Sequence, residues 1–359
     1  MKVVHITNCL LAGGIQNFLA SLLPEQVKAG WDVSIITIEE HTADYCHILE
    51  NKMVERGVKA YNLHKKRSNK ISFLHTIVQC RKLIRDIAPD VVNTHGSMAH
   101  VYGDYATRFT SIAQVLTVHN APERWDILCK LLNNSKPLIY CSHSAYDLRV
   151  QSNKNIIAID NGISTEITKS PNNVDLRSEL GLPSEAKIVL SVGSLRLQKN
   201  YELLKEISQA LGDSNIHFCV CGGSYGPGYM STKSFRQFKN IHFLGLRSDV
   251  SAIENASDLF LSCATFEGLP IAVLEAFFNG IPCVLSPIPQ HKAIAGGVAD
   301  CIIPATFDAT SFAQAIRMSL SKQHSHEEIY QKRLPVIEQF SISTTAKKYL
   351  EFYQSNLKL

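Results

Sequence analysis

Residues 2–38 read KVVHITNCLLAGGIQNFLASLLPEQVKAGWDVSIITI and contain the pattern that decides the fold. Residues 2–8 and 32–38 are short runs rich in β-branched side chains, which is typical of buried strands. Residues 15–29, between these runs, have the length and the apolar spacing of a helix. A strand, a helix and a second strand in this order favour a mostly parallel sheet.

The same alternation continues along the chain and is interrupted once. Further strands are predicted at 90–94, 114–119, 137–141 and 156–159, with another helix at 72–87. Residues 164–183 are polar and rich in turn-forming residues, which indicates a domain boundary. Beyond it, strands are predicted at 187–192, 216–221, 241–244, 259–262 and 282–286, and a closing helix is predicted at 344–357.

This organisation predicts an α/β protein with two Rossmann-like, doubly wound parallel-sheet domains that face a central cleft. We expect one domain at residues 1–165, a second at 166–340, and a C-terminal helix at 341–359 that packs back toward the first domain. Ligands of such sheets bind at the carboxyl ends of the strands, so the cleft is the expected site.

The composition excludes several classes of protein. Of the 359 residues, 45% are hydrophobic and 19% are charged, which is neither a disordered nor a low-complexity chain. The net charge of +4 does not by itself indicate nucleic-acid binding. The ten cysteines are scattered and form no C-x-x-C pair, which favours reduced thiols in a cytoplasmic protein. We expect no signal peptide and no membrane span, because no apolar run approaches the roughly 18–20 residues required.

Two glycine-containing turns follow predicted strands. Gly13 and Gly14 precede the first helix, where backbone N–H groups can approach an anion. The sequence there is not G-x-G-x-x-G, so a dinucleotide is disfavoured. Gly193 follows the first strand of the second half, and Arg196 and Lys199 come soon after it, well placed to hold a diphosphate. The alternatives are a tight turn without a ligand and ordinary surface charges on a loop.

The strongest motif is FEGLPIAVLE, which contains Glu267 and ends at Glu275. We expect a helix to begin near Gly268 or Leu269, because Pro270 is tolerated in a first helical turn. Glu275 is eight residues beyond Glu267, a little over two helical turns. Two carboxylates so separated indicate two hydroxyl-rich subsites with a phosphate between them, and not the close pair of a glycosidase. The alternative is a capped helix with an incidental glutamate.

These residues resemble the retaining glycosyltransferases of the GT-B fold, particularly glycosyltransferase family four. Glu267 and Glu275 match the E-x7-E motif of that family. The resemblance spans nearly the whole chain. It also rests on the early double glycine, the G-x-L-x-x-x-K-like stretch at 193–199, the Asn-Gly turn at 161–162 and the sequence FLG at 243–245.

The resemblance implies how a nucleotide-sugar donor is held. Arg196 and Lys199 would neutralise the diphosphate. Glu267 would bind the hydroxyls of the transferred sugar, and Glu275 would bind the ribose. The family's arginine usually follows the glycine directly, where this chain has Ser194, so Lys199 is the safer assignment of the two cations.

Further site residues follow from the same resemblance. His119 corresponds to a family position that hydrogen-bonds the donor sugar near the reacting bond, and His95 is a weaker candidate on the same side of the sheet. The alternative for both is an imidazole satisfied by neighbouring groups. The groups expected around the phosphates, sugar and base belong to Gly13, Gly14, Gly193, Leu246, Arg247, Gly268, Leu269 and Pro270.

The reaction implied is transfer of a sugar from a nucleoside-diphosphate sugar to an acceptor hydroxyl with retention of configuration. The departing phosphate oxygen would accept the acceptor's proton. No D-x-D metal clamp is evident, so we expect metal-independent activity without a cofactor. The resemblance implies bacterial surface-polysaccharide or lipopolysaccharide assembly, with a glycan or lipid-linked glycan as acceptor and no nucleic acid. The open alternatives are a nucleotide-sugar epimerase or hydrolase of this fold and a non-catalytic nucleotide-sugar-binding module.

Residues 52–85 form a basic stretch, with ten Lys and Arg residues against Glu55 as the single acid. The apolar residues Ile71, Phe73 and Leu74 are interleaved with these cations. This pattern predicts a surface that docks peripherally on anionic lipid at the inner membrane face, at about 1 kcal/mol per well-placed cation. The alternative is a basic face that is simply solvated.

Overall fold

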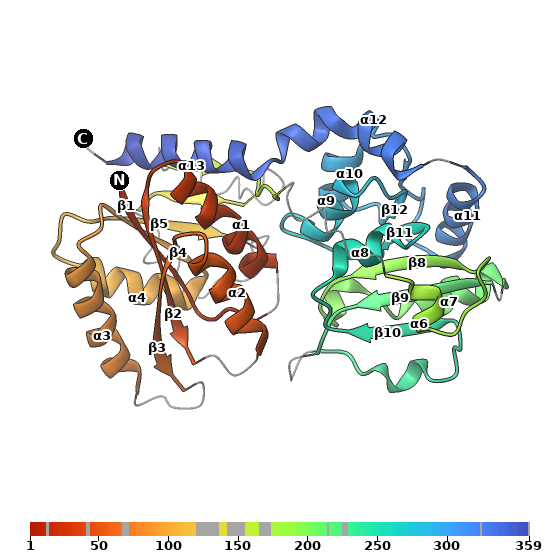
Figure 1. The fold of residues 1–359 in the computed structure, drawn as a ribbon, viewed down its shortest axis with the longest axis horizontal. Coiled ribbons are helices and arrows are strands. Elements are labelled where there is room, and N and C mark those ends of the chain that lie inside the picture. Colours follow the sequence, from red (N-terminus) through yellow and green to blue (C-terminus); the bar gives the residue numbers. More distant parts are fainter. Residues whose placement is uncertain are drawn as a thin grey trace. The chain divides into compact units, whose positions relative to one another are not determined.

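The computed structural model describes residues 1–11, 14–40, 44–66, 72–119, 136–141, 155–164, 174–213, 215–224, 229–323 and 325–357. The chain divides into two compact units. Unit 1 comprises Met1–Ile163 and Phe340–Leu359, and unit 2 comprises Ser164–Gln339 (Figure 1). The divisions fall within two residues of the boundaries drawn from the sequence.

Unit 1 is built on a parallel sheet of seven strands in the order β3-β2-β1-β4-β5-β6-β7. The strand order reverses between β1 and β4, so the topological switch point of this doubly wound sheet lies between these two strands. The strands are β1 (Lys2–Thr7), β2 (Asp32–Glu39), β3 (Lys59–Lys65), β4 (Val91–His95), β5 (Ala113–Val118), β6 (Leu138–Tyr140) and β7 (Ile156–Ala158).

Helices cover both faces of this sheet, as buried parallel strands require. One face packs against α1 (Gly14–Lys28), α2 (Asp44–Val54) and α13 (Ile342–Asn356), and the other against α3 (Ser72–Ile87) and α4 (Ser97–Thr107). Side chains alternate between the faces, so Val3 belongs to the first core and Val4 to the second. Helix α13 is the C-terminal helix, and it completes unit 1 beside α1 (Figure 1).

A glycine makes the return of the C-terminal segment to unit 1 possible. A Cβ on Gly162 would lie 2.5 Å from the backbone oxygen of Ser341 and 2.7 Å from the Cα of Ile342. Ile163 forms a parallel bridge with Ser341, and the Thr345 hydroxyl donates to the carbonyl of Asp160. Gly162 is therefore required by the close packing of these two segments.

Unit 2 repeats the topology with six parallel strands in the order β10-β9-β8-β11-β12-β13. The strands are β8 (Lys187–Val192), β9 (Ile216–Cys221), β10 (Ile241–Gly245), β11 (Leu259–Ser262), β12 (Cys283–Leu285) and β13 (Cys301–Ile302). The helices are α6 (Leu176–Glu179), α7 (Leu203–Leu211), α8 (Val250–Asn255), α9 (Ile271–Phe278), α10 (Pro289–Ala295), α11 (Ala309–Leu320) and α12 (His326–Gln339). The switch point lies between β8 and β11.

The predicted fold class, two doubly wound parallel-sheet domains, is confirmed by this topology. Two strands were missing from the prediction. Strand β3, KAYNLHK, is an edge strand with a mostly half-exposed surface, and β13 spans only two residues, so neither has an apolar run to mark it. Every cysteine in the described ranges is a free thiol. Over the same ranges, no helix is long and apolar enough to cross a membrane.

Candidate active site

Two loops of unit 2 meet at its switch point. The loop after β8 carries residues 193–200, and the loop after β11 carries residues 263–270. Because β8 and β11 are parallel neighbours, both loops leave the same edge of the sheet. The sequence pattern identified both stretches, and the structure brings them into direct contact.

The contact between the loops is an ion pair. The Lys199 Nζ lies 2.6 Å from Oε1 of Glu267, and the two side chains are 21% and 8% exposed. Lys199 closes a short 3-10 turn, Leu197–Lys199, which ends at Asn200 in the left-handed conformation. A cation held this close to a carboxylate and this near to solvent can still be reached by an anionic ligand.

Gln198 joins the two loops through hydrogen bonds, a role that the sequence pattern did not reveal. Its Nε2 donates to the carbonyl of Phe266 at 2.8 Å and to Oε2 of Glu267 at 3.2 Å. Its own carbonyl accepts from the backbone N–H of Thr265 at 2.9 Å. Both oxygens of Glu267 are therefore held, one by Lys199 and one by Gln198. The signal in the sequence was a long polar side chain directly before the predicted cation.

Gly193 makes room for the lysine. It has a φ of +152°, and a Cβ there would lie 2.9 Å from Cε of Lys199 and 3.1 Å from the hydroxyl of Tyr201. The Tyr201 hydroxyl donates to the Gly193 carbonyl at 3.0 Å. The absence of a side chain at Gly193 therefore leaves room for the aliphatic part of Lys199 to pass close to the backbone and reach Glu267.

Helix α9 begins later than the sequence predicted. Pro270 is its N-cap, with φ −79° and ψ 81°, and the first helical residue is Ile271. The start near Gly268 or Leu269 was wrong, because the backbone N–H of Ile271 bonds to the carbonyl of Leu269 in a tight turn first. Glu267 therefore precedes the helix, and counting helical turns from it to Glu275 does not apply. Gly268, Leu269 and Pro270 are all buried.

Glu275 lies on α9 beside a buried acid that the sequence did not reveal. Glu254, on α8, is fully buried, and Nδ2 of Asn279 donates to its Oε2. Its Oε1 has no hydrogen-bond partner within the described ranges. Burial raises the pKa of Glu254 well above its ordinary value, and the nearby Glu275 carboxylate raises it further. The neutral form of Glu254 is therefore favoured.

His291 lies beneath the site on α10. Its Nδ1 is 3.0 Å from both the hydroxyl and the carbonyl oxygen of Ser286, and its Nε2 is 3.5 Å from the hydroxyl of Ser262. The ring thus joins the carboxyl ends of β11 and β12. Burial, with a smaller contribution from the nearby Lys199, lowers the pKa of His291 to about 4. The imidazole is therefore neutral at physiological pH.

Two predicted cations lie apart from the ion pair. Arg196 is exposed and contacts Tyr229, with its Nε and Nη2 at 3.2 and 3.1 Å from the hydroxyl. Arg247 forms a double fork with Asp249 and Glu179. Hydrogen bonds to these two carboxylates raise the pKa of Arg247. The Arg247 guanidinium already binds two carboxylates of the protein. A ligand could therefore contact this loop through its backbone and through the half-exposed Leu246.

The candidate residues of unit 1 lie around the carboxyl edge of its sheet. Gly13 lies outside the described residues, and Gly14 is the exposed first residue of α1. His119 follows β5, is half-buried, and stands edge-on to Phe18 with ring centroids 5.7 Å apart. Its Nε2 lies 2.9 Å from Nδ1 of His95, the last residue of β4.

The imidazole contacts continue into the sheet. Nε2 of His95 lies 2.9 Å from Nδ1 of His5, and Nε2 of His5 lies 2.9 Å from Oε1 of Gln26 on α1. Burial lowers the pKa of His5 to about 4 and that of His119 to about 3, and it holds the pKa of His95 well below its ordinary range. We call His5, His95, His119 and Gln26 the histidine ladder. Two of its members, His5 and Gln26, were missed from sequence, although a histidine inside the apolar run KVVHIT was a signal.

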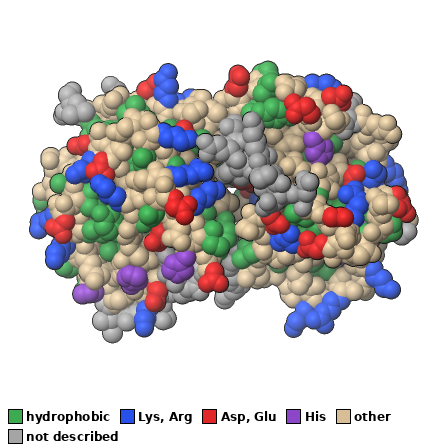
Figure 2. Space-filling model, in the orientation of Figure 1, with side chains coloured by type: hydrophobic (Ala, Val, Ile, Leu, Met, Phe, Trp, Pro, Cys, Tyr) green, Lys and Arg blue, Asp and Glu red, His purple; other side chains and the backbone are tan. Residues whose placement is uncertain are grey.

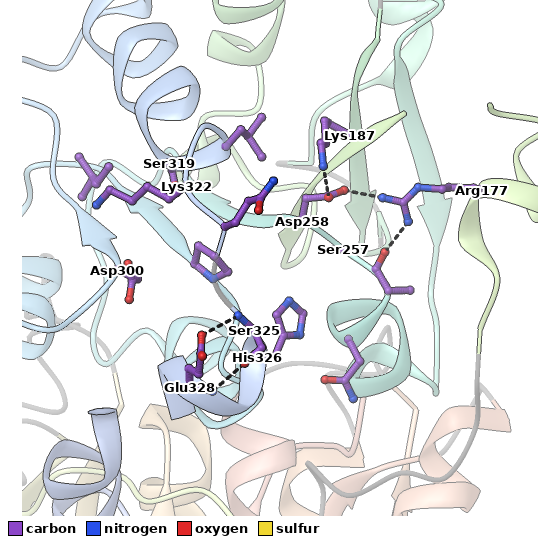
Figure 3. Close-up of a pocket in the computed structure, with 16 residues that line it drawn as sticks. Arg177, Lys187, Ser257, Asp258, Asp300, Ser319, Lys322, Ser325, His326 and Glu328 are labelled. Atoms are coloured by element: carbon purple, nitrogen blue, oxygen red, sulfur yellow. Dashed lines mark hydrogen bonds and ion pairs between the residues drawn. The ribbon is translucent and has the colours of Figure 1, made fainter. Parts of the chain in front are cut away.

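A different cavity lies at the opposite edge of the unit 2 sheet (Figure 3). It measures about 650 Å³ and is lined by residues that begin or precede strands, such as Lys187 and Asp258. Asp258 pairs with Arg177 at 2.6 Å and with Lys187 at 3.0 Å. These three charges are thus paired with one another at the amino ends of the strands, away from the loops that meet at the switch point.

Known proteins identify the family. The model of "Glycosyltransferase Family 4" matches residues 12–167, and that of "Glycosyl transferases group 1" matches residues 173–333. The chain belongs to the family-four type of GT-B glycosyltransferases. The two matches change over between residues 167 and 173, a few residues beyond the structural division after Ile163, so each family model covers most of one unit of this glycosyltransferase.

Individual relatives share most of its length. The UDP-Gal:alpha-D-GlcNAc-diphosphoundecaprenol alpha-1,3-galactosyltransferase of Escherichia coli is 25% identical, over 88% of this chain and 87% of that protein. The O-antigen biosynthesis glycosyltransferase WbnH of Escherichia coli is 24% identical, over 77% and 78%. Among solved structures, Anabaena Alr3699/HepE in complex with UDP-glucose superposes with a TM-score of 0.81 at 17% identity, over 99% of this chain and 100% of that chain. The predicted family and fold are confirmed.

Proposed function

We propose that this glycosyltransferase transfers a sugar from a nucleoside-diphosphate sugar to an acceptor hydroxyl with retention of anomeric configuration. The observation that carries the proposal is the Lys199–Glu267 pair at the switch point of unit 2. It places a cation for a diphosphate and a carboxylate for sugar hydroxyls within one contact. UDP-sugars are the first donors to test, because HepE was solved with UDP-glucose and the E. coli relative is named for UDP-Gal.

Donor binding would exchange one partner of Lys199 for another. Without donor, the ammonium is neutralised by Oε1 of Glu267. The diphosphate as a whole carries two negative charges against the single charge of the carboxylate, so it can compete for the ammonium. Its arrival would release Oε1 to accept a sugar hydroxyl, while Gln198 keeps the carboxylate in place through Oε2. The proposed roles of Glu275 at the ribose and of the Gly268–Pro270 backbone at the phosphates complete the donor site.

The chemical step is a substitution at the anomeric carbon. The bond from that carbon to the β-phosphate oxygen breaks, and the acceptor oxygen bonds to the same face of the sugar. The acceptor's proton passes to the departing phosphate oxygen, so the nucleoside diphosphate leaves with it. Lys199 would stabilise the negative charge that develops on the diphosphate, which is where a fixed cation lowers the barrier most.

The acceptor would be a glycan or a lipid-linked glycan of a bacterial surface polysaccharide. The printed names of two relatives support this class, one with a diphosphoundecaprenol-linked acceptor and one in O-antigen biosynthesis. Nucleic acid is not expected as a partner, and the net charge of +4 gives no reason to expect it.

The test begins with a panel of nucleoside-diphosphate sugars and the full-length protein. The correct donor at 100 times its dissociation constant should add about 2.7 kcal/mol to the unfolding free energy, seen as a raised melting temperature. NMR of the product then reads its anomeric configuration. An inverted product contradicts the retaining proposal. Donor turnover without any acceptor favours an epimerase or hydrolase, and binding without turnover favours a non-catalytic module.

We propose further that transfer needs no metal and no cofactor. Lys199 would supply the positive charge that a metal clamp provides in other phosphate chemistry. Over the described ranges, no group of three or more His, Cys, Asp or Glu side chains is arranged to hold a metal ion. We expect EDTA to leave the transfer rate unchanged. A rate that EDTA abolishes and manganese restores contradicts this part of the proposal.

Helix α3 is the proposed membrane-docking element of unit 1. Leu74 and Val78, one turn apart, are 72% and 67% exposed, and Lys82 and Arg85 continue the exposed surface. Exposed apolar side chains beside cations favour an anionic lipid surface. On the face drawn in Figure 2, Lys and Arg side chains of unit 1 lie among Asp and Glu side chains, as on an ordinary solvated surface.

One interleaved residue of the basic stretch does not contribute to that surface. Phe73 packs edge-on against Tyr102, with ring centroids 5.3 Å apart, and so belongs to the core. Ile71 lies outside the described residues. Co-sedimentation with phosphatidylglycerol vesicles should be lost in a Lys82→Glu, Arg85→Glu variant and absent with phosphatidylcholine vesicles. Equal sedimentation of both proteins would leave α3 a solvated face.

A further inference from the structure

The histidine ladder crosses three neighbouring strands in equal steps. In the strand register, His5 of β1 is opposite Asn93 of β4, and His95 is two residues further along β4. His95 is opposite Thr117 of β5, and His119 is again two residues further. Each step of two residues keeps the side chains on one face of the sheet. The ladder therefore runs diagonally across the sheet, from His5 in the middle of β1 to His119 at the carboxyl edge.

The ladder has only two consistent proton arrangements. Each of the three rings is neutral at physiological pH, because burial disfavours the imidazolium form. A neutral imidazole has one N–H donor and one acceptor nitrogen. In each nitrogen–nitrogen contact one ring must donate and the other accept, so fixing the proton on one ring fixes it on all three.

Gln26 selects between the two arrangements. It presents Oε1 to Nε2 of His5, and a carbonyl oxygen can only accept. Nε2 of His5 must therefore carry the proton, which leaves its Nδ1 to accept from Nε2–H of His95. Nδ1 of His95 must in turn accept from Nε2–H of His119. Gln26 is fully buried on α1, and its Nε2 has no hydrogen-bond partner among the described residues.

We propose that Gln26, His5 and His95 are positioning residues that hold His119 as its Nε2–H tautomer, so that Nδ1 is left as a hydrogen-bond acceptor for a ligand. Nδ1 of His119 makes no hydrogen bond to any part of the chain that the structure describes. The ligand group that suits it is a hydroxyl that donates, and this part rests on the proposed function, in which the substrate is a nucleoside-diphosphate sugar that carries such hydroxyls. The reverse ladder would present an N–H donor instead.

The surroundings keep the ladder in place without competing for its protons. A second polar row runs beside it, in which the Thr117 hydroxyl donates to Oδ1 of Asn93 at 3.0 Å and Nδ2 of Asn93 donates to the hydroxyl of Tyr353 on α13. Phe18 meets His119 edge-on. The C-terminal helix thus closes the same face of the sheet in which the ladder lies.

The first test needs no substitution and no substrate. Long-range proton–nitrogen NMR of the full-length protein, labelled with nitrogen-15 in histidine, reports which imidazole nitrogen carries the proton. We expect His5, His95 and His119 all to be protonated at Nε2 alone. A His119 ring protonated at Nδ1, or one that averages between the tautomers, overturns the proposal. The His217–His242 pair of unit 2 is half-buried and has nitrogens 3.1 Å apart. It serves as the internal control, because it is a histidine pair outside the ladder in the same spectrum.

The second test uses the direction of control. Gln26→Met removes the accepting oxygen at similar size and should turn the single tautomer of His119 into a mixture. His119→Gln should leave His5 protonated at Nε2, because Gln26 still fixes that end. Unchanged signals of His119 in Gln26→Met, or a changed tautomer of His5 in His119→Gln, contradict control by Gln26. If Gln26→Met does not fold, the wild-type spectrum and His119→Gln still decide.

The activity of Gln26→Met tests the link to the donor. If the two proton arrangements of the ladder have equal energy in Gln26→Met, only half of the molecules have His119 in the tautomer that binds the donor. The KM for the donor should therefore rise by about twofold or more. A donor that lacks the accepted hydroxyl should show the same KM with both proteins. The spectra are recorded without a donor, so they stand or fall apart from the proposed reaction. An altered His119 tautomer with every donor's KM unchanged overturns the assignment of Nδ1 to a substrate hydroxyl.

Discussion

At the carboxyl edge of the unit 1 sheet the polar side chains are three neutral imidazoles joined nitrogen to nitrogen, whereas at the same edge of the unit 2 sheet they are a lysine and a glutamate joined as ions. Both edges belong to doubly wound parallel sheets. They differ in burial at their inner ends, since His5 and His95 are at most 2% exposed whereas the Lys199 and Glu267 side chains are 21% and 8% exposed, and only His119 of the three imidazoles is half-buried. Burial favours neutral groups and partial exposure tolerates charge, so one topology supports two kinds of chemistry.

Removing the cation from unit 2 should have the largest effect. Lys199→Ala leaves Glu267 without its partner and the proposed diphosphate without its cation, so we expect the transfer rate to fall about 100-fold or more. The measurement is kcat with saturating donor. Lys205→Ala is the matched control, because Lys205 also pairs with a glutamate, Glu202, but at the start of α7 and outside the two loops. Near-full activity of Lys199→Ala would remove this lysine from the mechanism.

The histidine ladder should make unit 1 sensitive to acid. The folded-state pKa of His5 is lowered to about 4 from an ordinary value of 6.5, so its stabilising contribution is complete above pH 6.5 and is lost as the pH falls toward 4. In this window the unfolded chain binds more protons, and each such histidine costs about 1.4 kcal/mol per pH unit.

The ladder's contribution can be isolated by one substitution. His5→Gln should flatten the loss of hydrogen-exchange protection in unit 1 between pH 6.5 and 4, measured on the full chain. His217→Gln is the control, since its ring is only half-buried and its pKa is also lowered by burial. Equal slopes for wild type and His5→Gln would mean that the ladder does not titrate with folding.

Unit 2 contains a buried acid with the opposite sign. Because the pKa of Glu254 is raised in the folded state, its contribution to stability is complete below pH 4.5 and is lost as the pH rises through the folded-state value. Glu254→Gln should therefore increase the protection of unit 2 at neutral pH and remove this dependence. Exposed Glu206 on α7 provides the control, Glu206→Gln. Lower protection in Glu254→Gln than in wild type at neutral pH would contradict a neutral Glu254.

The sequence predicted the parts of this comparison that depend on local pattern. Strands β8, β9 and β11 and helix α3 have the bounds that their apolar periodicity predicted, because short buried runs and amphipathic spacing are local signals. The contact between the two loops of unit 2 was approached only through the family resemblance. Nothing near Lys199 in the sequence specifies that it meets Glu267, which is 68 residues away.

What the sequence could not predict depends on strand register and packing. The ladder exists because the offsets between β1, β4 and β5 place His5, His95 and His119 on one diagonal, and no offset is written in any single strand. Glu254 was missed for a similar reason, since its burial comes from α9 packing over α8. The late start of α9 depends on one local hydrogen bond, from the N–H of Ile271 to the carbonyl of Leu269. The preference of proline for the first helical turn does not predict this bond.

The smallest effect should come from the second cation of unit 2. Arg196 is exposed, and its guanidinium lies over the Tyr229 ring, 5.3 Å from the centroid, so in the free protein it interacts with an aromatic ring and not with Glu267. An exposed contact of this kind contributes little, and we expect Arg196→Ala to lower kcat/KM by less than about tenfold, which is about 1.4 kcal/mol. Tyr229→Phe keeps the stacking and removes the hydroxyl, and it should leave the rate near wild type. A loss in Arg196→Ala as large as that in Lys199→Ala would mean that Arg196 leaves Tyr229 and joins the diphosphate when the donor binds. Both cations would then act on the same charge, and the double variant would lose less than the product of the two single losses.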